Sequence, residues 1–177
     1  MKIAVIGTGR IGGTLGQRWR DAGHDVTYGS REGSGTGPGG AAALSVADAL
    51  TGAEVVAAHG TALGGKVVID AANRIGQPDV NSQAEIAAAA PDARYVRAFN
   101  TLGWENFADP PPGAALFFAA DPGARPAAEE LITAVGLEPV FAGDASAAGT
   151  VDALLVLWFA LVQHNDGNRR VALQITR

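Results

Sequence analysis

A glycine-rich turn between a short apolar segment and an amphipathic one constrains this chain more than any other feature. Residues 2–6 (KIAVI) form an almost continuous apolar run, which is typical of a strand buried on both faces of a parallel sheet. The turn at residues 7–12 (GTGRIG) has the spacing GxGxxG. Apolar residues then recur at helical spacing until Gly23 ends the segment. The sequence therefore predicts a strand–turn–helix unit at the start of a layered α/β fold.

The three glycines of this turn have separate roles in a dinucleotide site. Gly7 allows the tight turn, Gly9 lets a pyrophosphate approach the backbone, and Gly12 lets the helix pack closely on the strand. The start of the helix presents unpaired N–H groups and a partial positive charge to the phosphates. Because the motif lies between a buried strand and a helix, it predicts a dinucleotide site rather than a turn without a ligand.

The end of the second predicted strand, residues 25–28, indicates which dinucleotide binds. An NAD site usually has an Asp or Glu there, which accepts hydrogen bonds from the ribose 2′-hydroxyl. This chain has Ser30 and Arg31 instead, and a guanidinium suits a 2′-phosphate. Arg10 in the turn could approach the same phosphate. Glu32 supports the opposite interpretation, because a shift of one residue would make it the ribose acid. We predict NADP as the cofactor.

The rest of the chain continues to alternate strands with helices. Further strands are predicted at 66–70, 94–98, 115–119 and 139–141, and helices at 82–90, about 103–108 and 126–135. This alternation predicts a Rossmann-type, doubly wound α/β fold with a mostly parallel sheet, formed as one domain over residues 1–177.

One region departs from the regular alternation. If 54–58 and 66–70 were neighbouring parallel strands, only seven residues would connect them, whereas a crossover with its helix needs at least about ten. We therefore expect residues 46–58 to form one helix, which leaves the sheet one strand short. Either the chain has lost this strand, or the sequence lacks residues there. The flanking sequences GAEVV and VAAHGTALGGKVVID resemble the two sides of an excision, which favours the second explanation.

The segment 151–162 (VDALLVLWFALV) is apolar almost all round, which predicts a helix buried on every side. A domain of this size cannot easily surround a whole helix. We therefore expect part of it to pack on a second subunit or to line a ligand pocket, with an ordinary core helix as the alternative.

Composition excludes several function classes. The 18 acidic against 13 basic residues offer no basic footprint for nucleic acid, and the absence of cysteine excludes disulfides and thiol chemistry. The longest apolar run, 154–162, is about half of a bilayer crossing. We expect a soluble, cytoplasmic protein without a membrane partner, with no catalytic acid or base and no metal ligand. His24, His59 and His164 are interpreted as turn or surface residues.

These motifs also carry a resemblance. The opening 32 residues, together with KVVIDAAN (66–73), YVRAFNT (95–101), 116–121, 143–160 and 165–177, resemble the coenzyme F420-dependent NADP oxidoreductase family. GSR (29–31) and AFNT (98–101) are its more specific elements. The resemblance covers most of the chain.

The resemblance implies a homodimer that moves hydride between NADP(H) and the deazaflavin F420. It implies that Thr8, Arg10, Ser30 and Arg31 bind the NADP phosphates, and that a second set of residues shapes the nicotinamide and deazaflavin pocket. That second set is Ala71, Asn73, Phe99, Asn100 and Thr101. The C-terminal segment, about 146–177, would form the dimer contact and the pocket wall. The complete predicted cofactor site is Gly7, Thr8, Gly9, Arg10, Ile11, Gly12, Ser30, Arg31, Ala71, Asn73, Phe99, Asn100 and Thr101.

Two other functions stay open at this point. One is an NADPH-dependent reductase of an imine, ketone or quinone, which would usually need a proton donor beside the nicotinamide. The other is a non-catalytic NADP(H)-binding module that senses redox state, with its acceptor pocket closed by a side chain such as Trp104 or Trp158.

Overall fold

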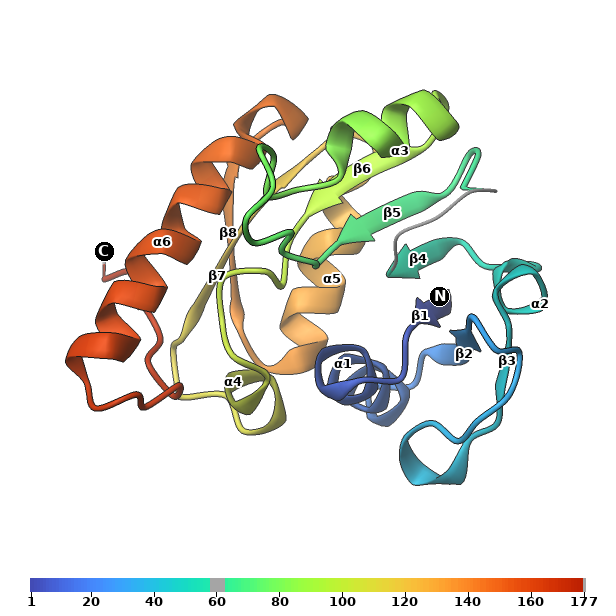
Figure 1. Ribbon diagram of the computed structural model, residues 1–177, viewed down its shortest axis with the longest axis horizontal. Helices are drawn as coiled ribbons and strands as arrows, with labels where there is room; N and C mark the ends of the chain where they lie inside the picture. The colour runs from blue at the N-terminus through green and yellow to red at the C-terminus, as the bar shows by residue number, and fades with distance from the viewer. Residues whose placement is uncertain (58–62, 177) are drawn as a thin grey trace.

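The computed structural model describes residues 1–57 and 63–176 and contains one eight-stranded sheet in the order β3-β2-β1-β4-β5-β6-β7-β8 (Figure 1). All neighbouring strands are parallel except β6 and β7. The strands are β1 (Lys2–Ile6), β2 (Asp25–Ser30), β3 (Ala43–Ser45), β4 (Val55–Ala57), β5 (Val67–Asp70), β6 (Arg94–Arg97), β7 (Ala115–Ala120) and β8 (Glu138–Gly143). The predicted mostly parallel α/β sheet is confirmed.

Helices connect the strands and cover the sheet (Figure 1). They are α1 (Arg10–Asp21), α2 (Val46–Leu50), α3 (Gln83–Ala89), α4 (Trp104–Ala108), α5 (Arg125–Val135) and α6 (Ala148–His164), with short 3-10 turns η1 (Pro38–Gly40) and η2 (Ala145–Ala147). Each predicted helix other than the one at 46–58 is present, with bounds that differ by a few residues. The core between helices and sheet contains Trp19, Phe99, Phe107 and Phe118, all nearly inaccessible to solvent.

The expectation of a single helix over 46–58 is wrong. Helix α2 stops at Leu50, Gly52 takes a positive φ of 74°, and β4 begins at Val55. β4 pairs in parallel with β1 through Ile3 and with β5 through Val67. The sheet therefore has a strand where the sequence predicted none, because burial and pairing on both sides outweigh local helical spacing. The connection from β4 to β5 includes residues 58–62, which lie outside the described residues.

Helix α6 lies along the side of the sheet beside β7 and β8 (Figure 1). Val151, Leu155, Trp158 and Val162 are buried, whereas Val156 and Leu157 are exposed on the outer face. Phe159, at the edge of the buried face, is partly exposed at the cavity. As the sequence analysis expects of a domain of this size, the chain itself buries only part of the helix, and burial of the rest by a second subunit stays a prediction. By length and composition, the stretch Ala145–His164 would suffice to cross a membrane, and 39% of its most apolar window is buried against the protein.

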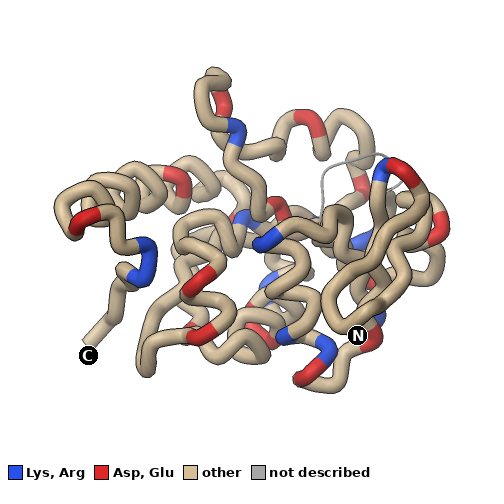
Figure 2. The backbone as a smooth tube through the Cα atoms, turned by 60° about the horizontal axis from the view of Figure 1, so that its bottom comes forward, with Lys and Arg blue, Asp and Glu red and all other residues tan. Residues whose placement is uncertain are grey.

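Charged residues of both signs are interspersed along the described chain (Figure 2). Most ion pairs lie at the surface, such as Arg125 with Glu129 and Arg170 with Asp109. Such pairs contribute about 0–1 kcal/mol each to stability. The two ion pairs of Arg97, with Asp70 and with Asp152, are exceptions. The Arg97 and Asp70 side chains are completely buried, and the Asp152 side chain is 10% exposed.

Candidate functional site

The glycine turn has the geometry that each of its three glycines predicts. Gly7 has a φ of +107°, in the region that favours glycine. A Cβ on Gly12 would lie 2.2 Å from the carbonyl oxygen of Gly7, so a side chain there would separate α1 from the turn. A Cβ on Gly9 would meet nothing within 4 Å, which leaves the space beside the backbone open. Gly9 begins α1 without any side-chain cap, so the first N–H groups of the helix are left for another acceptor.

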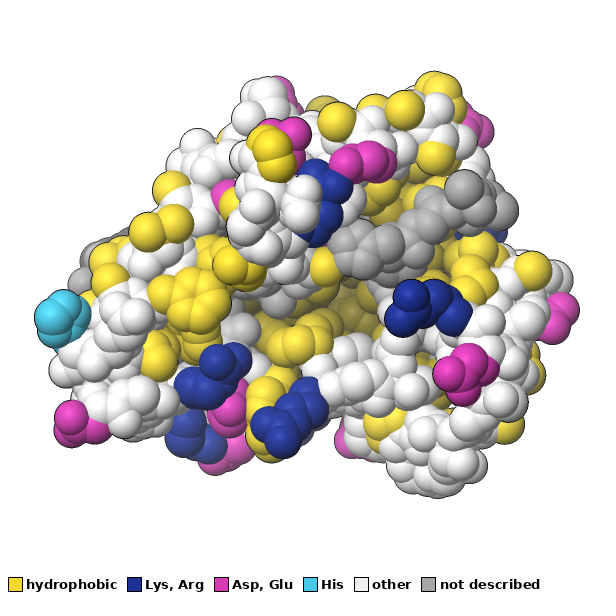
Figure 3. All heavy atoms as spheres, viewed as in Figure 1, with side chains coloured by type: hydrophobic (Ala, Val, Ile, Leu, Met, Phe, Trp, Pro, Cys, Tyr) yellow, Lys and Arg dark blue, Asp and Glu magenta, His cyan; other side chains and the backbone are white. Residues whose placement is uncertain are grey.

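This turn opens onto a cavity of about 500 Å³ between α6 and the carboxyl ends of the parallel strands. Figure 3 shows a hollow on this face, with hydrophobic side chains on its floor and Lys or Arg side chains at its rim. The lining residues are Val5, Ile6, Gly7, Gly9, Arg10, Ile11, Gly12, Leu15, Ala57, Ala71, Ala72, Asn73, Phe99, Asn100, Leu102, Leu155, Trp158, Phe159 and Arg169. Ligands of open α/β sheets bind at this end of the strands.

The cavity brings together most of the residues predicted from the sequence. Gly7, Gly9, Arg10, Ile11, Gly12, Ala71, Asn73, Phe99 and Asn100 all line it. Four predicted residues do not: Thr8 belongs to the same turn, Thr101 is buried beside Asn100, and Ser30 and Arg31 lie at the end of β2.

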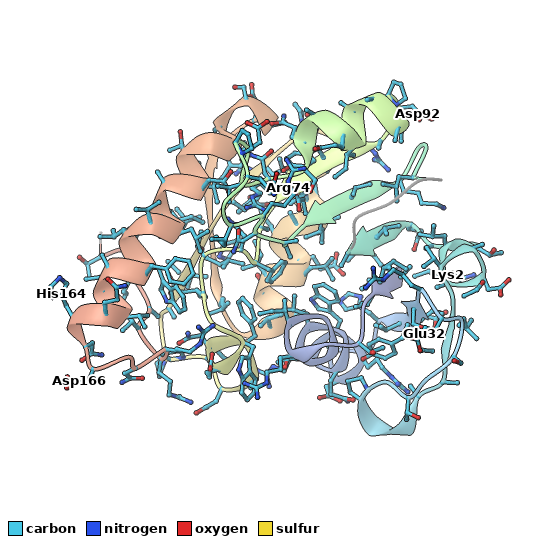
Figure 4. All side chains as sticks on the ribbon, in the orientation of Figure 1. Lys2, Glu32, Arg74, Asp92, His164 and Asp166 are labelled. Carbon is cyan, nitrogen blue, oxygen red and sulfur yellow. The ribbon has the colours of Figure 1, made fainter. Side chains whose placement is uncertain are left out.

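The end of β2 presents an exposed cation beside the glycine turn. The N–H of Gly7 donates to the carbonyl of Gly29 (2.9 Å), which holds the turn against this strand end. The Ser30 hydroxyl donates to the carbonyl of Ser34 (2.8 Å) and accepts from its N–H (3.2 Å). Arg31 and Glu32 are exposed, and neither has a hydrogen bond or ion pair among the described residues. Figure 4 shows Glu32 on the loop that follows β2.

The chain takes an uncommon conformation where β6 ends at the cavity. Phe99 has a φ of 61°, a left-handed conformation that costs a non-glycine residue about 1–3 kcal/mol. Its ring makes edge contacts with Trp19 and Phe107, at centroid distances of 5.7 and 5.8 Å. The Asn73 side chain donates to the carbonyl of Asn100 (2.7 Å). Packing and this hydrogen bond hold two neighbouring strand ends in one arrangement.

A buried ionic cluster behind the cavity was missed by the sequence analysis. The Arg97 guanidinium donates from Nε to Asp152 Oδ1 (2.7 Å), and its Nη1 lies 3.4 Å from Asp70 Oδ1. Asp70 also accepts from the N–H of Ser82 (2.6 Å) and the hydroxyl of Tyr95 (3.0 Å). Burial, followed by the negative charge of Asp70, raises the pKa of Tyr95 well above its usual value. The available sequence signal was a single carboxylate, Asp152, in an otherwise apolar segment.

The C-terminal part of the cavity wall comes from α6 and the segment after it. Leu155, Trp158 and Phe159 contribute apolar surface, and the Trp158 indole N–H donates to the carbonyl of Val171 (3.0 Å). The guanidinium of Arg169 stands 5.0 Å from the centre of the Trp158 ring. Part of this helix thus lines the cavity, whereas its role as the wall of a second-cofactor pocket stays a prediction. Trp158 is the one of these residues that the sequence analysis named singly, as a side chain that would close the pocket.

His24 and His164 are not among the residues that line the cavity. His24 faces Glu130 at 3.9 Å and the N-terminal amine at 3.4 Å. His164 is exposed at the end of α6 and points outward in Figure 4. His59 lies outside the described residues.

Solved structures similar to this chain include bacterial proteins and reductases. A protein from Arthrobacter sp. FB24, provisionally assigned as an F420-dependent NADP-reductase, has a TM-score of 0.83 and 25% identity, with 100% of each chain covered. A hypothetical protein from Sinorhizobium meliloti has a TM-score of 0.68 and 28% identity, over 84% of this chain and 88% of that one. A reductive aminase from Aspergillus terreus, in complex with NADPH and ethyl-5-oxohexanoate, has a TM-score of 0.69 and 20% identity, over 92% of this chain and 62% of that one. No protein-family model and no curated protein matches the sequence significantly.

The sheet order, the glycine turn and the position of the cavity define a Rossmann-type α/β protein. The full-length likeness to the Arthrobacter protein confirms the resemblance to F420-dependent NADP oxidoreductases that the sequence motifs indicated.

Proposed function

We propose that this chain is an NADP(H)-dependent oxidoreductase that transfers hydride between NADPH and coenzyme F420 or a flavin-like acceptor. The observation that carries the proposal is the glycine turn that opens into an apolar cavity at the carboxyl ends of the strands. The residues fit a dinucleotide: Gly9 leaves room for a pyrophosphate at the start of α1, and Gly12 permits the close approach of that helix. Thr8 and Ile11 belong to the same proposed phosphate site.

We assign the 2′-phosphate to Ser30, Arg31 and Arg10. The exposed Arg31 guanidinium is not engaged by another described residue, so its N–H donors are available for a phosphate. Arg10 stands in the first turn of α1, with its guanidinium 5.5 Å from the centre of the Trp104 ring. Glu32, also exposed, is the residue that would favour NAD instead.

The opposite end of the cavity is the proposed hydride-transfer site. Bound NADPH supplies the hydride, so the chain's own task is to orient two rings and to exclude water. Ala71, Asn73, Phe99 and Asn100 shape the floor, and Thr101 supports it from behind. Among the described lining residues, the ionisable side chains are Arg10 and Arg169, and an arginine does not give up a proton at neutral pH. This lining favours direct hydride transfer over reduction of an imine, ketone or quinone with a protein proton donor.

The redox-sensing module is the second alternative, and the cavity argues against it. That alternative requires Trp104 or Trp158 to close the acceptor pocket. Trp158 instead lines an open cavity of about 500 Å³, and its indole is held against Val171. The mixing experiment at the end of the Discussion tests transfer directly, because a sensing module would bind NADPH without passing on its hydride.

We propose that α6 also forms a homodimer contact through its outer face. Val156 is 71% exposed on this face, beside Leu157 at 45%, and adjacent exposed apolar side chains are typical of an interface. The protein should elute as a dimer in size exclusion with light scattering, and Val156→Asp should shift it to the monomer mass. Ile75→Asp is the matched control, because Ile75 is 65% exposed in the loop after β5. A monomeric wild type, or equal effects of both variants, would contradict this contact. We further propose that the protein acts on a small-molecule acceptor and is cytoplasmic.

A further inference from the structure

The Arg97 side chain joins two walls of the cavity that are far apart in the sequence. Its guanidinium donates four hydrogen bonds and also makes close ion-pair contacts with two carboxylates. Nη1 donates to the carbonyls of Asp70 (3.0 Å) and Ala72 (2.6 Å), and Nη2 donates to the Asn73 side chain (2.8 Å). Nε donates to Asp152 Oδ1 (2.7 Å), and Nη2 lies 2.6 Å from the same oxygen. One guanidinium therefore holds the β5 strand end and α6 together.

Asp152 connects Arg97 to the part of α6 that lines the cavity. Asp152, Leu155 and Phe159 are separated by three and four positions, so they lie on one face of the helix. Leu155 and Phe159 line the cavity, whereas the Asp152 carboxylate also accepts from the Asn100 amide (3.1 Å) and the Asn81 amide (2.7 Å). The Asp152 carboxylate, one helical turn before Leu155, therefore accepts hydrogen bonds from Arg97, Asn100 and Asn81.

We infer that Arg97 and Asp152 are positioning residues that set the separation between α6 and the strand ends, and so the fit of the hydride acceptor. This inference rests on the proposed function for the identity of the acceptor. Among the described residues, the hydrogen bonds and ion pairs of Arg97 and Asp152 do not reach the glycine turn or the end of β2, so we expect dinucleotide phosphates to bind independently of this cluster. Because a displacement of about 1 Å at a reacting centre can cost about a hundredfold in rate, a small shift of α6 is sufficient.

Asp152→Asn tests this inference, because it keeps the shape of the side chain and removes its charge. With NADP⁺ present, the variant should bind oxidised F420 about tenfold more weakly, as expected for a typical coupling between sites, and should bind NADPH within about twofold of wild type. Asp144→Asn is the matched control, because Asp144 is exposed just before the same helix and only caps Ser146. Val151→Ala controls for a general loss of packing in α6, since Val151 is buried beside Asp152.

A second readout does not depend on the acceptor. The chain has no cysteine, so spin labels at Ile75→Cys and His164→Cys report the distance between the β5 loop and the end of α6. Diluted with unlabelled protein, the Asp152→Asn background should give a broader or shifted distance distribution than the Asp144→Asn background. An unchanged distribution would overturn the inference, as would a parallel loss of NADPH and F420 affinity that matches Val151→Ala.

These readouts distinguish failure of the proposed acceptor from failure of the positioning role. If the wild type binds no F420, the proposed acceptor fails while the label distances still decide the positioning role. If Asp152→Asn does not fold, Asn81→Ala removes the hydrogen bond to the other carboxylate oxygen of Asp152, together with the bond that the Asn81 side chain accepts from the Gln83 N–H at the start of α3. Asn81→Ala should then broaden or shift the distribution of distances between the two spin labels, as expected for Asp152→Asn. An unchanged distribution would overturn the inference in that case too.

Discussion

Arg97→Met should lower the free energy of unfolding by about 3–5 kcal/mol, because removal of one partner leaves buried charge uncompensated. Arg97 and Asp70 have no exposed side-chain surface, and Asp152 is only 10% exposed. Methionine fills a similar volume but donates no hydrogen bond, so both carboxylates and the carbonyls of Asp70 and Ala72 lose a donor. Urea denaturation followed by circular dichroism measures this loss.

Arg170→Met is the matched control for that substitution. Arg170 also pairs with an aspartate, Asp109, at 2.7 Å, but the two side chains are 48% and 76% exposed. Solvent screening limits the effect of its loss to about 1 kcal/mol or less. Comparable destabilisation by the two variants would contradict the assignment of Arg97 as the centre of a buried cluster.

Arg31→Ala should weaken NADPH binding by about ten- to a hundredfold and change NADH binding by less than about threefold. The expected loss corresponds to about 1.5–3 kcal/mol, the usual contribution of a hydrogen bond to a charged group. NADH has no 2′-phosphate, so it cannot use these donors. Dissociation constants from titration of nucleotide fluorescence, measured at one salt concentration, provide the comparison.

Glu32→Ala tests the alternative interpretation of this loop, in which Glu32 binds the ribose of NAD. If Glu32 is the ribose acid of an NAD site, its loss should weaken NADH while Arg31→Ala affects both nucleotides equally. We expect the opposite, with NADPH binding unchanged or slightly stronger after removal of a negative charge near the phosphate. Equal effects of Arg31→Ala on NADPH and NADH would show that Arg31 does not recognise the 2′-phosphate.

The local parts of the fold and site could be predicted because short-range sequence determines them. The glycine turn needs a positive φ at Gly7 and no side chain at Gly12, and both requirements are visible in the spacing alone. The buried strands of the parallel sheet are short apolar runs, and Pro126 with Gly136 bounds α5.

The parts of the fold and site that the sequence did not predict depend on contacts between residues that are distant in the chain. Val56 and Ala57 continue the helical spacing of Val46 and Leu50, but pairing with β1 and β5 makes them part of a strand. Arg97 was not singled out from the sequence, because Asp152, one of its buried carboxylate partners, is 55 residues away along the chain. No local pattern contains either contact.

Transfer of hydride to the acceptor tests the central claim most directly. Purified protein is mixed with NADPH and oxidised F420, and the deazaflavin absorbance is followed while NADPH binding is measured in the same sample. We predict bleaching of the oxidised deazaflavin, stoichiometric with NADPH consumption, and much slower bleaching with NADH. Bound NADPH without any bleaching, with F420 and with FMN, would contradict the account.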